Sequence, residues 1–242
     1  QEISQCLKGQ DAADQSQLDE RMIGLDATPN KERLGANAIL AASLASAKAA
    51  APGLGIAVHE HIGRLHGSLD PARLPVPQMN ILNGGAHADN RIDFQEFMVL
   101  PVGVVSFKEA VRCGVEIFHQ LRENLIAAGL QTGVGDEGGF APDFPSNEAG
   151  LQAVLGAVEQ SGYVIPSDVL LGLDLASSEF FEKDRYHLRS ESKSYDSSEF
   201  VAVISDLARR LPVISLEDPL AEDDWKGWIA LTEELGASVQ LT

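Results

Sequence analysis

An apolar run, Val169-Leu170-Leu171-Gly172-Leu173-Asp174-Leu175, carries a single aspartate near its end. A second run of the same kind, from Pro212 to Leu216, is followed by Glu217-Asp218-Pro219. The two acids are 217 − 174 = 43 residues apart, a plausible distance for one βα repeat. Continuous apolar strands are typical of sheets covered on both faces, as parallel sheets are. The two runs therefore predict an α/β fold, as an open doubly wound sheet or a βα barrel.

Strand-like runs alternate with helical patterns through the second part of the chain. Ser106-Phe107-Lys108-Glu109 has the spacing of a capping box and predicts the start of a helix that Gly129 stops. Further helices are predicted over about 147–161, 196–207 and 225–235, and strands over 79–82, 96–100, 169–175, 186–188, 212–216 and 239–241. Asp174 and Glu217 would then lie at strand ends, where barrels gather their active sites.

The first part of the chain has only helical patterns. Helices are predicted over residues 11–24, over an alanine-rich stretch at 37–51, and over 56–64. Residues 67–77 contain Pro71, Pro75 and Pro77 and are the best candidate for a linker between two domains.

Composition excludes several classes of protein. The chain has 242 residues, 44% of them apolar, and a formal net charge of −18, which argues against a nucleic-acid surface. An anionic ligand stays allowed, because a bound cation can reverse the charge of a site locally. Cys6 and Cys113 form no CxxC pattern, which fits a reducing compartment. Without a signal pattern or a membrane-spanning run, we expect a cytoplasmic protein with no membrane partner.

Both ends of the chain have the character of cut ends. It opens on Gln1 rather than Met, and it closes on the strand-like run Val239-Gln240-Leu241-Thr242. We therefore expect a piece of a longer protein.

Two adjacent carboxylates stand between glycines in Val134-Gly135-Asp136-Glu137-Gly138-Gly139-Phe140. A glutamate near another glutamate has a raised pKa and can act as a general acid, and Glu96 is the natural partner for Glu137. The alternative is a plain turn whose glycines serve backbone geometry. His87 follows Asn83-Gly84-Gly85, and a loop histidine there can bind an anion or carry a proton, although a lone histidine is more often structural.

Asp174 and Glu217 together predict an oxygen-lined cation site. Magnesium takes hard oxygen ligands, commonly one or two carboxylates with substrate and water. The alternative is that each acid caps the turn or helix that follows it. Two further interpretations concern the surroundings: Asp89 and Asp93 are taken as solvated loop acids, and Trp225 with Trp228 as core residues. The sequence has no GxxxxGK[ST] phosphate loop, GxGxxG fingerprint or GxSxG nucleophile elbow.

Six segments together resemble the enolase family. They are Leu34 to Leu40, Leu82 to Ala88, Asp93 to Met98, Val134 to Phe140, Leu173 to Phe180 and Ile214 to Pro219. Their order and spacing agree with the family over nearly the whole chain. The resemblance implies an enolase-type α/β barrel of mixed strand direction, with its last strands missing, over residues 69–242. It also implies that residues 1–68 are the helical remnant of a small α+β N-terminal domain.

The resemblance implies the phosphopyruvate hydratase reaction of glycolysis, the reversible dehydration of 2-phosphoglycerate to phosphoenolpyruvate with Mg²⁺. In such enzymes a lysine removes the α-proton, metal ions stabilise the enolate, and a glutamate helps hydroxide leave as water. The handling of a very weakly acidic α-proton by a Lys or His base with one or two Mg²⁺ ions is a general pattern of the superfamily.

The roles carry over residue by residue. Asp174 and Glu217 match two of the three protein ligands of the tightly held magnesium. Glu137 matches the acid that protonates the departing hydroxyl, and Glu96 matches its partner. The residues implied to face the substrate are His87, Gln95, Glu96 and Glu217.

The family residues that would follow Thr242 include the third metal ligand, the base lysine and the phosphate-binding residues, and a mobile serine loop precedes the match to Gln1. We therefore expect the chain as given to be inactive, and the full-length protein to be a homodimer or a larger homo-oligomer. Two alternatives stay open. One is another carboxylate lyase or racemase of the enolase superfamily, and the other is a non-catalytic binding protein, for which cell-surface or secreted display is conceivable.

Overall fold

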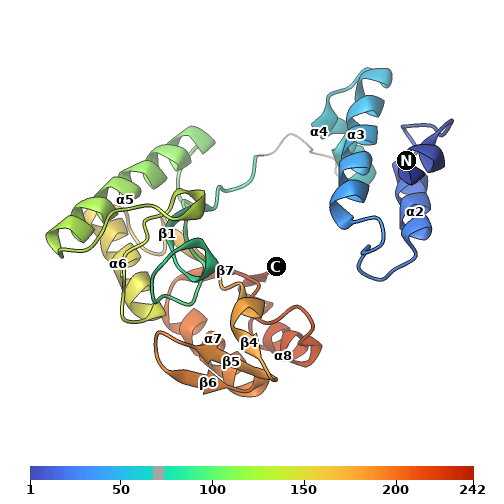
Figure 1. The fold of residues 1–242 in the computed structure, drawn as a ribbon. Helices are drawn as coiled ribbons and strands as arrows, with labels where there is room; N and C mark the ends of the chain where they lie inside the picture. The colour runs from blue at the N-terminus through green and yellow to red at the C-terminus, as the bar shows by residue number, and fades with distance from the viewer. Residues whose placement is uncertain (68–73) are drawn as a thin grey trace. The chain divides into compact units, whose positions relative to one another are not determined.

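The computed structural model describes residues 1–67 and 74–242, which divide into two compact units, Gln1–Leu74 and Pro75–Thr242 (Figure 1). The predicted domain boundary between residues 68 and 69 lies outside the described residues, as does most of the predicted linker. The boundary therefore stays a prediction.

The first unit is made of helices: α1 (Glu2–Leu7), α2 (Gln15–Asp26), α3 (Ala36–Gly53) and α4 (Val58–His66). Leu18 and Met22 of α2 are buried in contact range of α3, whose buried residues are mostly alanines such as Ala47. Small side chains let two helices approach closely, and the amide of Gln15 adds a link by donating to Ser43 Oγ at 2.9 Å. The predicted helices are confirmed, with α1 as an addition.

Among the helices of the described residues, none is by itself both long enough and apolar enough to cross a bilayer. Only α3 and α4 taken together meet these requirements of length and composition, and they are bent by 108° at their break.

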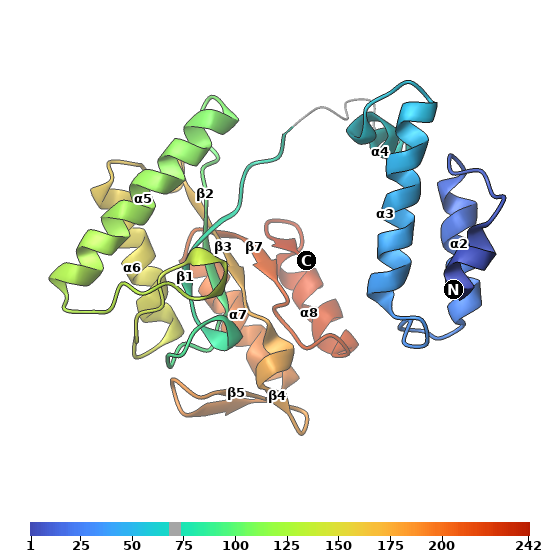
Figure 2. The same cartoon turned by 45° about the horizontal axis from the view of Figure 1, so that its top comes forward.

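The second unit is built on a five-stranded sheet in the order β1-β2-β3-β7-β8 (Figure 2). Its strands are β1 (Met79–Asn83), β2 (Glu96–Leu100), β3 (Leu170–Asp174), β7 (Val213–Glu217) and β8 (Gln240–Leu241). The β1–β2 and β2–β3 pairs are antiparallel, whereas β3–β7 and β7–β8 are parallel. The predicted α/β class and the mixed strand direction are both confirmed.

Helices cover one face of this sheet. They are α5 (Phe107–Ala127), α6 (Asn147–Gln160), α7 (Ser197–Arg210) and α8 (Trp225–Leu235), with α5 and α6 side by side. Phe97 of β2 reaches Gly150 of α6 and pairs in register with Leu173 of β3, so these two side chains face the helices. The alternation of a strand then sends the intervening residues, such as Met98 and Glu96, to the opposite face.

The predicted helix starts are confirmed by their caps. The Ser106 hydroxyl accepts a hydrogen bond from the backbone N–H of Glu109 at 3.2 Å. At α7, Asp196 accepts from the N–H of Glu199, and the Glu199 carboxylate accepts from the N–H of Asp196, which is a complete capping box.

A small antiparallel sheet, β4-β5-β6, was foreseen only in its middle strand. It contains β4 (Phe181–Glu182), β5 (Arg185–Leu188) and β6 (Lys193–Tyr195). The β4–β5 turn consists of Lys183 and Asp184, both with positive φ. Such two-residue turns normally carry Asn or Gly, so the sequence has no turn signal here.

The core assignment of Trp225 was wrong. Its side chain is 70% exposed, and so is Ile229, at 60%, one turn further along α8. The buried face of α8 carries Leu231 and Leu235 instead. Trp228 is half-buried against the core, and its indole N–H donates to the carbonyl of Ala221 at 3.1 Å.

Candidate active site

Three carboxylates meet at one edge of the main sheet because of strand direction and register. Glu96 is the first residue of β2 and pairs with Asp174, the last residue of the antiparallel β3. Asp174 pairs in turn with Glu217, the last residue of the parallel β7. Directly paired residues project to the same face of a sheet, so the three side chains are neighbours on the face away from the helices. The structure thus brings together Asp174 and Glu217, as the sequence led us to expect.

Asp174 is buried and held by two donors. Gln95 Nε2 donates to its Oδ2 at 3.1 Å, and the N–H of Ala176 donates to its Oδ1 at 2.9 Å. Burial raises the pKa of Asp174, while these hydrogen bonds oppose the rise. Gln95 is therefore a neighbour of the acid pair.

Glu217 has fewer compensating contacts. Among the hydrogen bonds between described residues, none reaches its carboxylate. Burial raises the pKa of Glu217, and repulsion from Asp174, Asp218 and Glu137 raises it further. A half-buried carboxylate surrounded by other acids favours either a proton or a cation as its neighbour.

The loop of Glu137 is docked on β1 by its backbone. The N–H of Asn83 donates to the carbonyl of Phe140 at 2.8 Å, and the N–H of Phe140 donates to Ile81 at 3.0 Å. Glycines make the approach feasible, because a Cβ at Gly135 would lie 2.3 Å from the carbonyl oxygen of His87. Glu137 itself has φ 62° in a short 3₁₀ turn, Asp136–Gly138. The glycines thus serve backbone geometry, and that geometry places Glu137 at the edge of the sheet.

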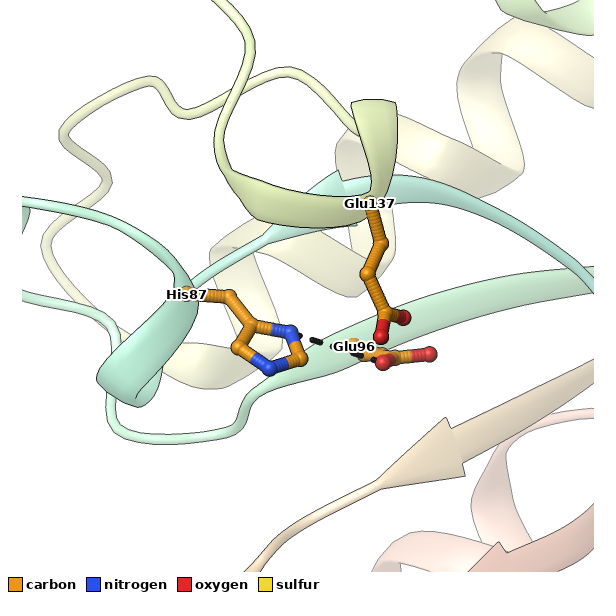
Figure 3. Close-up of side chains that lie close together, drawn as sticks. All are labelled: His87, Glu96 and Glu137. Carbon is orange, nitrogen blue, oxygen red and sulfur yellow. Dashed lines mark ion pairs between the residues drawn. The ribbon is translucent and has the colours of Figure 1, made fainter.

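Glu96, Glu137 and His87 form a compact cluster (Figure 3). One ligand atom of each lies within 4.8 Å of the others. Burial, the hydrogen bond with Glu137 and repulsion from the neighbouring acids together raise the pKa of Glu96 to about 8. A carboxyl group with this pKa keeps its proton at neutral pH, and Glu96 can donate that proton in its hydrogen bond with Glu137. This is the acid pair predicted from the sequence, now with both side chains in reach of each other.

His87 completes the cluster from the loop that follows β1. Its Nδ1 lies 3.5 Å from Glu96 Oε1, within ion-pair range and too long for a good hydrogen bond. That nitrogen is buried and has no hydrogen-bond partner within the described part of the chain. The ring thus lies at the cluster with one buried nitrogen that no described residue hydrogen-bonds.

The pair Asp174 and Glu217 and the cluster of Glu96, Glu137 and His87 suit different roles. A magnesium ion prefers oxygen ligands, which Asp174 and Glu217 supply, whereas a site with an imidazole suits zinc and other transition metals. No Lys or Arg within 1–67 and 74–242 forms an ion pair with either of these two acids. Their negative charge is therefore uncompensated in the described residues, and a hard divalent cation fits the donor set.

Asp93 was wrongly interpreted as a solvated loop acid. It is 9% exposed and accepts a hydrogen bond from the N–H of Arg189 at 2.7 Å and from the side chain of Asn147 at 3.3 Å. The hydroxyl of Ser190 also donates to it. The sequence missed this contact set because its members are 54, 96 and 97 residues away along the chain. Asp89, its neighbour, is exposed as expected.

Two family models match the chain. The enolase C-terminal TIM barrel domain matches residues 71–242, and the enolase N-terminal domain matches residues 1–62. The first match alone spans more than half of the chain and contains every acid of the cluster. The order of the two matches agrees with the two compact units of the structure. The chain belongs to the enolase family.

Proposed function

We propose that this chain carries the acid and metal-binding part of a lyase that interconverts 2-phosphoglycerate and phosphoenolpyruvate. The main support is that Glu96, Asp174 and Glu217 are directly paired across three neighbouring strands. Glu137 lies at the same edge of the sheet, on a separate loop, and is hydrogen-bonded to Glu96. Repulsion between four neighbouring acids lowers the stability of the fold. A dehydration reaction that needs a cation and a proton donor at this place explains why the acids are gathered there.

Asp174 and Glu217 would hold the Mg²⁺ ion. When bound, the ion would supply positive charge that lowers the energy of the negative charge developing on the substrate carboxylate. Thr242 lies beside Asp218, the residue after Glu217, because β8 runs parallel to β7. The N–H of Asp218 donates to the carbonyl of Thr242 at 3.0 Å. Gln95 orients Asp174 by its hydrogen bond, and we propose that it also faces the substrate.

Glu96 and Glu137 would handle the proton of the leaving group. Glu96 keeps its proton at neutral pH and is sheltered, while Glu137, its hydrogen-bond partner, is exposed. In the direction of dehydration, Glu137 gives a proton to the departing hydroxyl, which leaves as water, and Glu96 passes its own proton to Glu137. His87, whose buried Nδ1 has no hydrogen-bond partner among the described residues, would close on the substrate from the neighbouring loop.

The reaction also needs a base for the α-proton and cations for the phosphate group. The ion pairs between described residues place no Lys or Arg on Glu96, Glu137, Asp174 or Glu217. We propose that other residues of a full enzyme supply these functions, so that the 242 residues alone bind Mg²⁺ without turnover. For the complete protein we propose a homodimer or a larger homo-oligomer in the cytoplasm, in keeping with Cys6 and Cys113 both being free thiols.

Magnesium binding tests the chain itself. We expect Mg²⁺ to raise the melting temperature of the 242-residue protein, since a ligand at 100 times its Kd stabilises by about 2.7 kcal/mol. Asp174→Asn and Glu217→Gln should each abolish the rise, while Asp89→Asn, an exposed acid in the same unit, should keep it. A folded chain that shows no Mg²⁺-dependent rise would favour the non-catalytic binding protein.

The reaction needs a second assay on a longer protein that contains these residues. Phosphoenolpyruvate formation followed by ultraviolet absorbance should depend on Mg²⁺ and on 2-phosphoglycerate. If that protein binds Mg²⁺ yet acts only on other carboxylates, the wider-superfamily lyase or racemase is the correct reading.

A further inference from the structure

The side-chain amide of Asn90 links two loops that carry site residues. Its Nδ2 donates one hydrogen bond to the carbonyl of Asn83 and one to the carbonyl of Pro142, both at 3.0 Å. Its Oδ1 accepts from the N–H of Ile92 at 3.2 Å. Both donors and one acceptor position of the amide are therefore used on backbone groups, and all three contacts are partly sheltered from water.

The two carbonyls belong to different segments of the site. Asn83 ends β1, and the turn from Asn83 to Asn90 contains His87. Pro142 follows the loop of Glu137. One amide thus closes the His87 turn and ties that turn to the Glu137 loop. The same two segments also meet where Gly135 lies against the carbonyl of His87.

A second side-chain link between the same loops differs in its exposure. Arg91 Nε donates to Asp143 Oδ1 at 2.9 Å, and the two side chains are 63% and 54% exposed. Exposed ion pairs hold their partners weakly, because water competes for both charges. An amide that satisfies two carbonyls cannot be replaced so easily, since losing it leaves both acceptors without a donor.

We infer that Asn90 is a positioning residue that holds His87 and Glu137 in reach of Glu96. Asn90→Asp is the sharpest test, because the side chain keeps its shape, loses both donors, and sets a carboxylate against two carbonyl oxygens. Asp143→Asn is the matched control, because it weakens the exposed link between the same two loops.

The readout is the nitrogen NMR signal of the His87 ring in protein with labelled histidine, assigned with His87→Gln. In the parent chain, Glu137→Gln should shift this signal, because the two groups share one cluster. The same substitution should have a much smaller effect in the Asn90→Asp background and an undiminished effect in the Asp143→Asn background. A full response in Asn90→Asp would overturn the inference, and so would the lack of any response in the parent chain.

If Asn90→Asp does not unfold cooperatively, Asn90→Ser replaces it, since serine is too short to reach both carbonyls and adds no charge. The consequence for catalysis rests on the proposed function. In a protein that dehydrates 2-phosphoglycerate, Asn90→Asp should lower kcat about 100-fold, the order of loss expected from misplacing a catalytic group by about 1 Å. Should the parent protein lack that activity, the proposed function fails, while the NMR comparison still decides the role of Asn90.

Discussion

Asp93 and Glu96 are three residues apart in the chain, and the structure surrounds them in opposite ways. Asp93 is enclosed by donors: the N–H of Arg189, the hydroxyl of Ser190 and the amide of Asn147. Glu96 has three acids and the His87 ring as its neighbours, and its pKa rises to about 8 through burial, the hydrogen bond with Glu137 and repulsion from the acids.

The difference separates a structural acid from one that is ready for chemistry. Donors around a buried carboxylate satisfy its charge and make it part of the fold. Acids around a buried carboxylate leave it needing a proton or a cation, which is an unfavourable state that the rest of the fold has to support. Both acids are sheltered from water, so burial alone does not distinguish a structural acid from a reactive one. The groups that surround each carboxylate do.

The largest expected effect tests the reactive side of this comparison. Glu137→Gln keeps the shape of the side chain and removes the carboxyl group that is proposed to give its proton to the leaving hydroxyl. In a protein that forms phosphoenolpyruvate, kcat should fall by about 10²- to 10⁴-fold, the usual contribution of a general acid. The unfolding free energy should stay within about 0.5 kcal/mol of the parent, since Glu137 is exposed. Steady-state kinetics beside urea unfolding would check both, and a matching loss of stability would contradict a catalytic role.

The structural side is tested by Asp93→Ala. Removing the carboxylate leaves the N–H of Arg189, the Asn147 amide and the Ser190 hydroxyl without their acceptor in a sheltered position. We expect the unfolding free energy to fall by about 3 kcal/mol, as for other buried hydrogen-bonded charges. Urea unfolding measures it, with Asp89→Ala as the exposed control, expected within about 0.5 kcal/mol of the parent. Equal losses of stability in Asp93→Ala and Asp89→Ala would contradict a structural role for Asp93.

The smallest expected effect is the pH dependence of stability that follows from the raised pKa of Glu96. Its pKa is about 8 in the folded chain and 4.5 for an ordinary glutamate, so the folded chain binds more protons between these values. The free energy of unfolding therefore falls as pH rises through this window. Glu96→Gln removes that titration, and above pH 8 we expect it to stabilise the metal-free chain by on the order of 2 kcal/mol.

Glu148 supplies a control of opposite sign. Arg210 lowers the pKa of Glu148, so this pair contributes stability above the ordinary glutamate pKa and loses it in acid. Glu148→Gln should cost at most about 1 kcal/mol at neutral pH, because the pair is exposed. Thermal unfolding across pH, in a chelating buffer, compares the two variants. A Glu96→Gln curve parallel to that of the parent would contradict the raised pKa.

The fold was accessible from sequence where the patterns were long and regular. The run around Leu173 predicted β3, and Ser106 and Asp196 predicted two helix starts that their caps confirm. The β4–β6 sheet was largely missed, because its strands have two to four residues and Lys183-Asp184 forms a turn that normally carries Asn or Gly. Trp225 was misplaced because residue type does not state which face of a helix lies against the core.

The sequence alone identified the acids of the candidate site, because a charged residue at the end of an apolar run is a local signal. Glu137 between glycines and Asp174 at the end of its run are both visible without coordinates. Which acids touch which partners was decided only by the tertiary structure. Antiparallel pairing brings the start of β2 to the end of β3, and long loops bring Asn90 and Asp93 to carbonyls and donors far away in the chain. Hydrogen bonds and pKa shifts depend on distances in space, which no local pattern of residues contains.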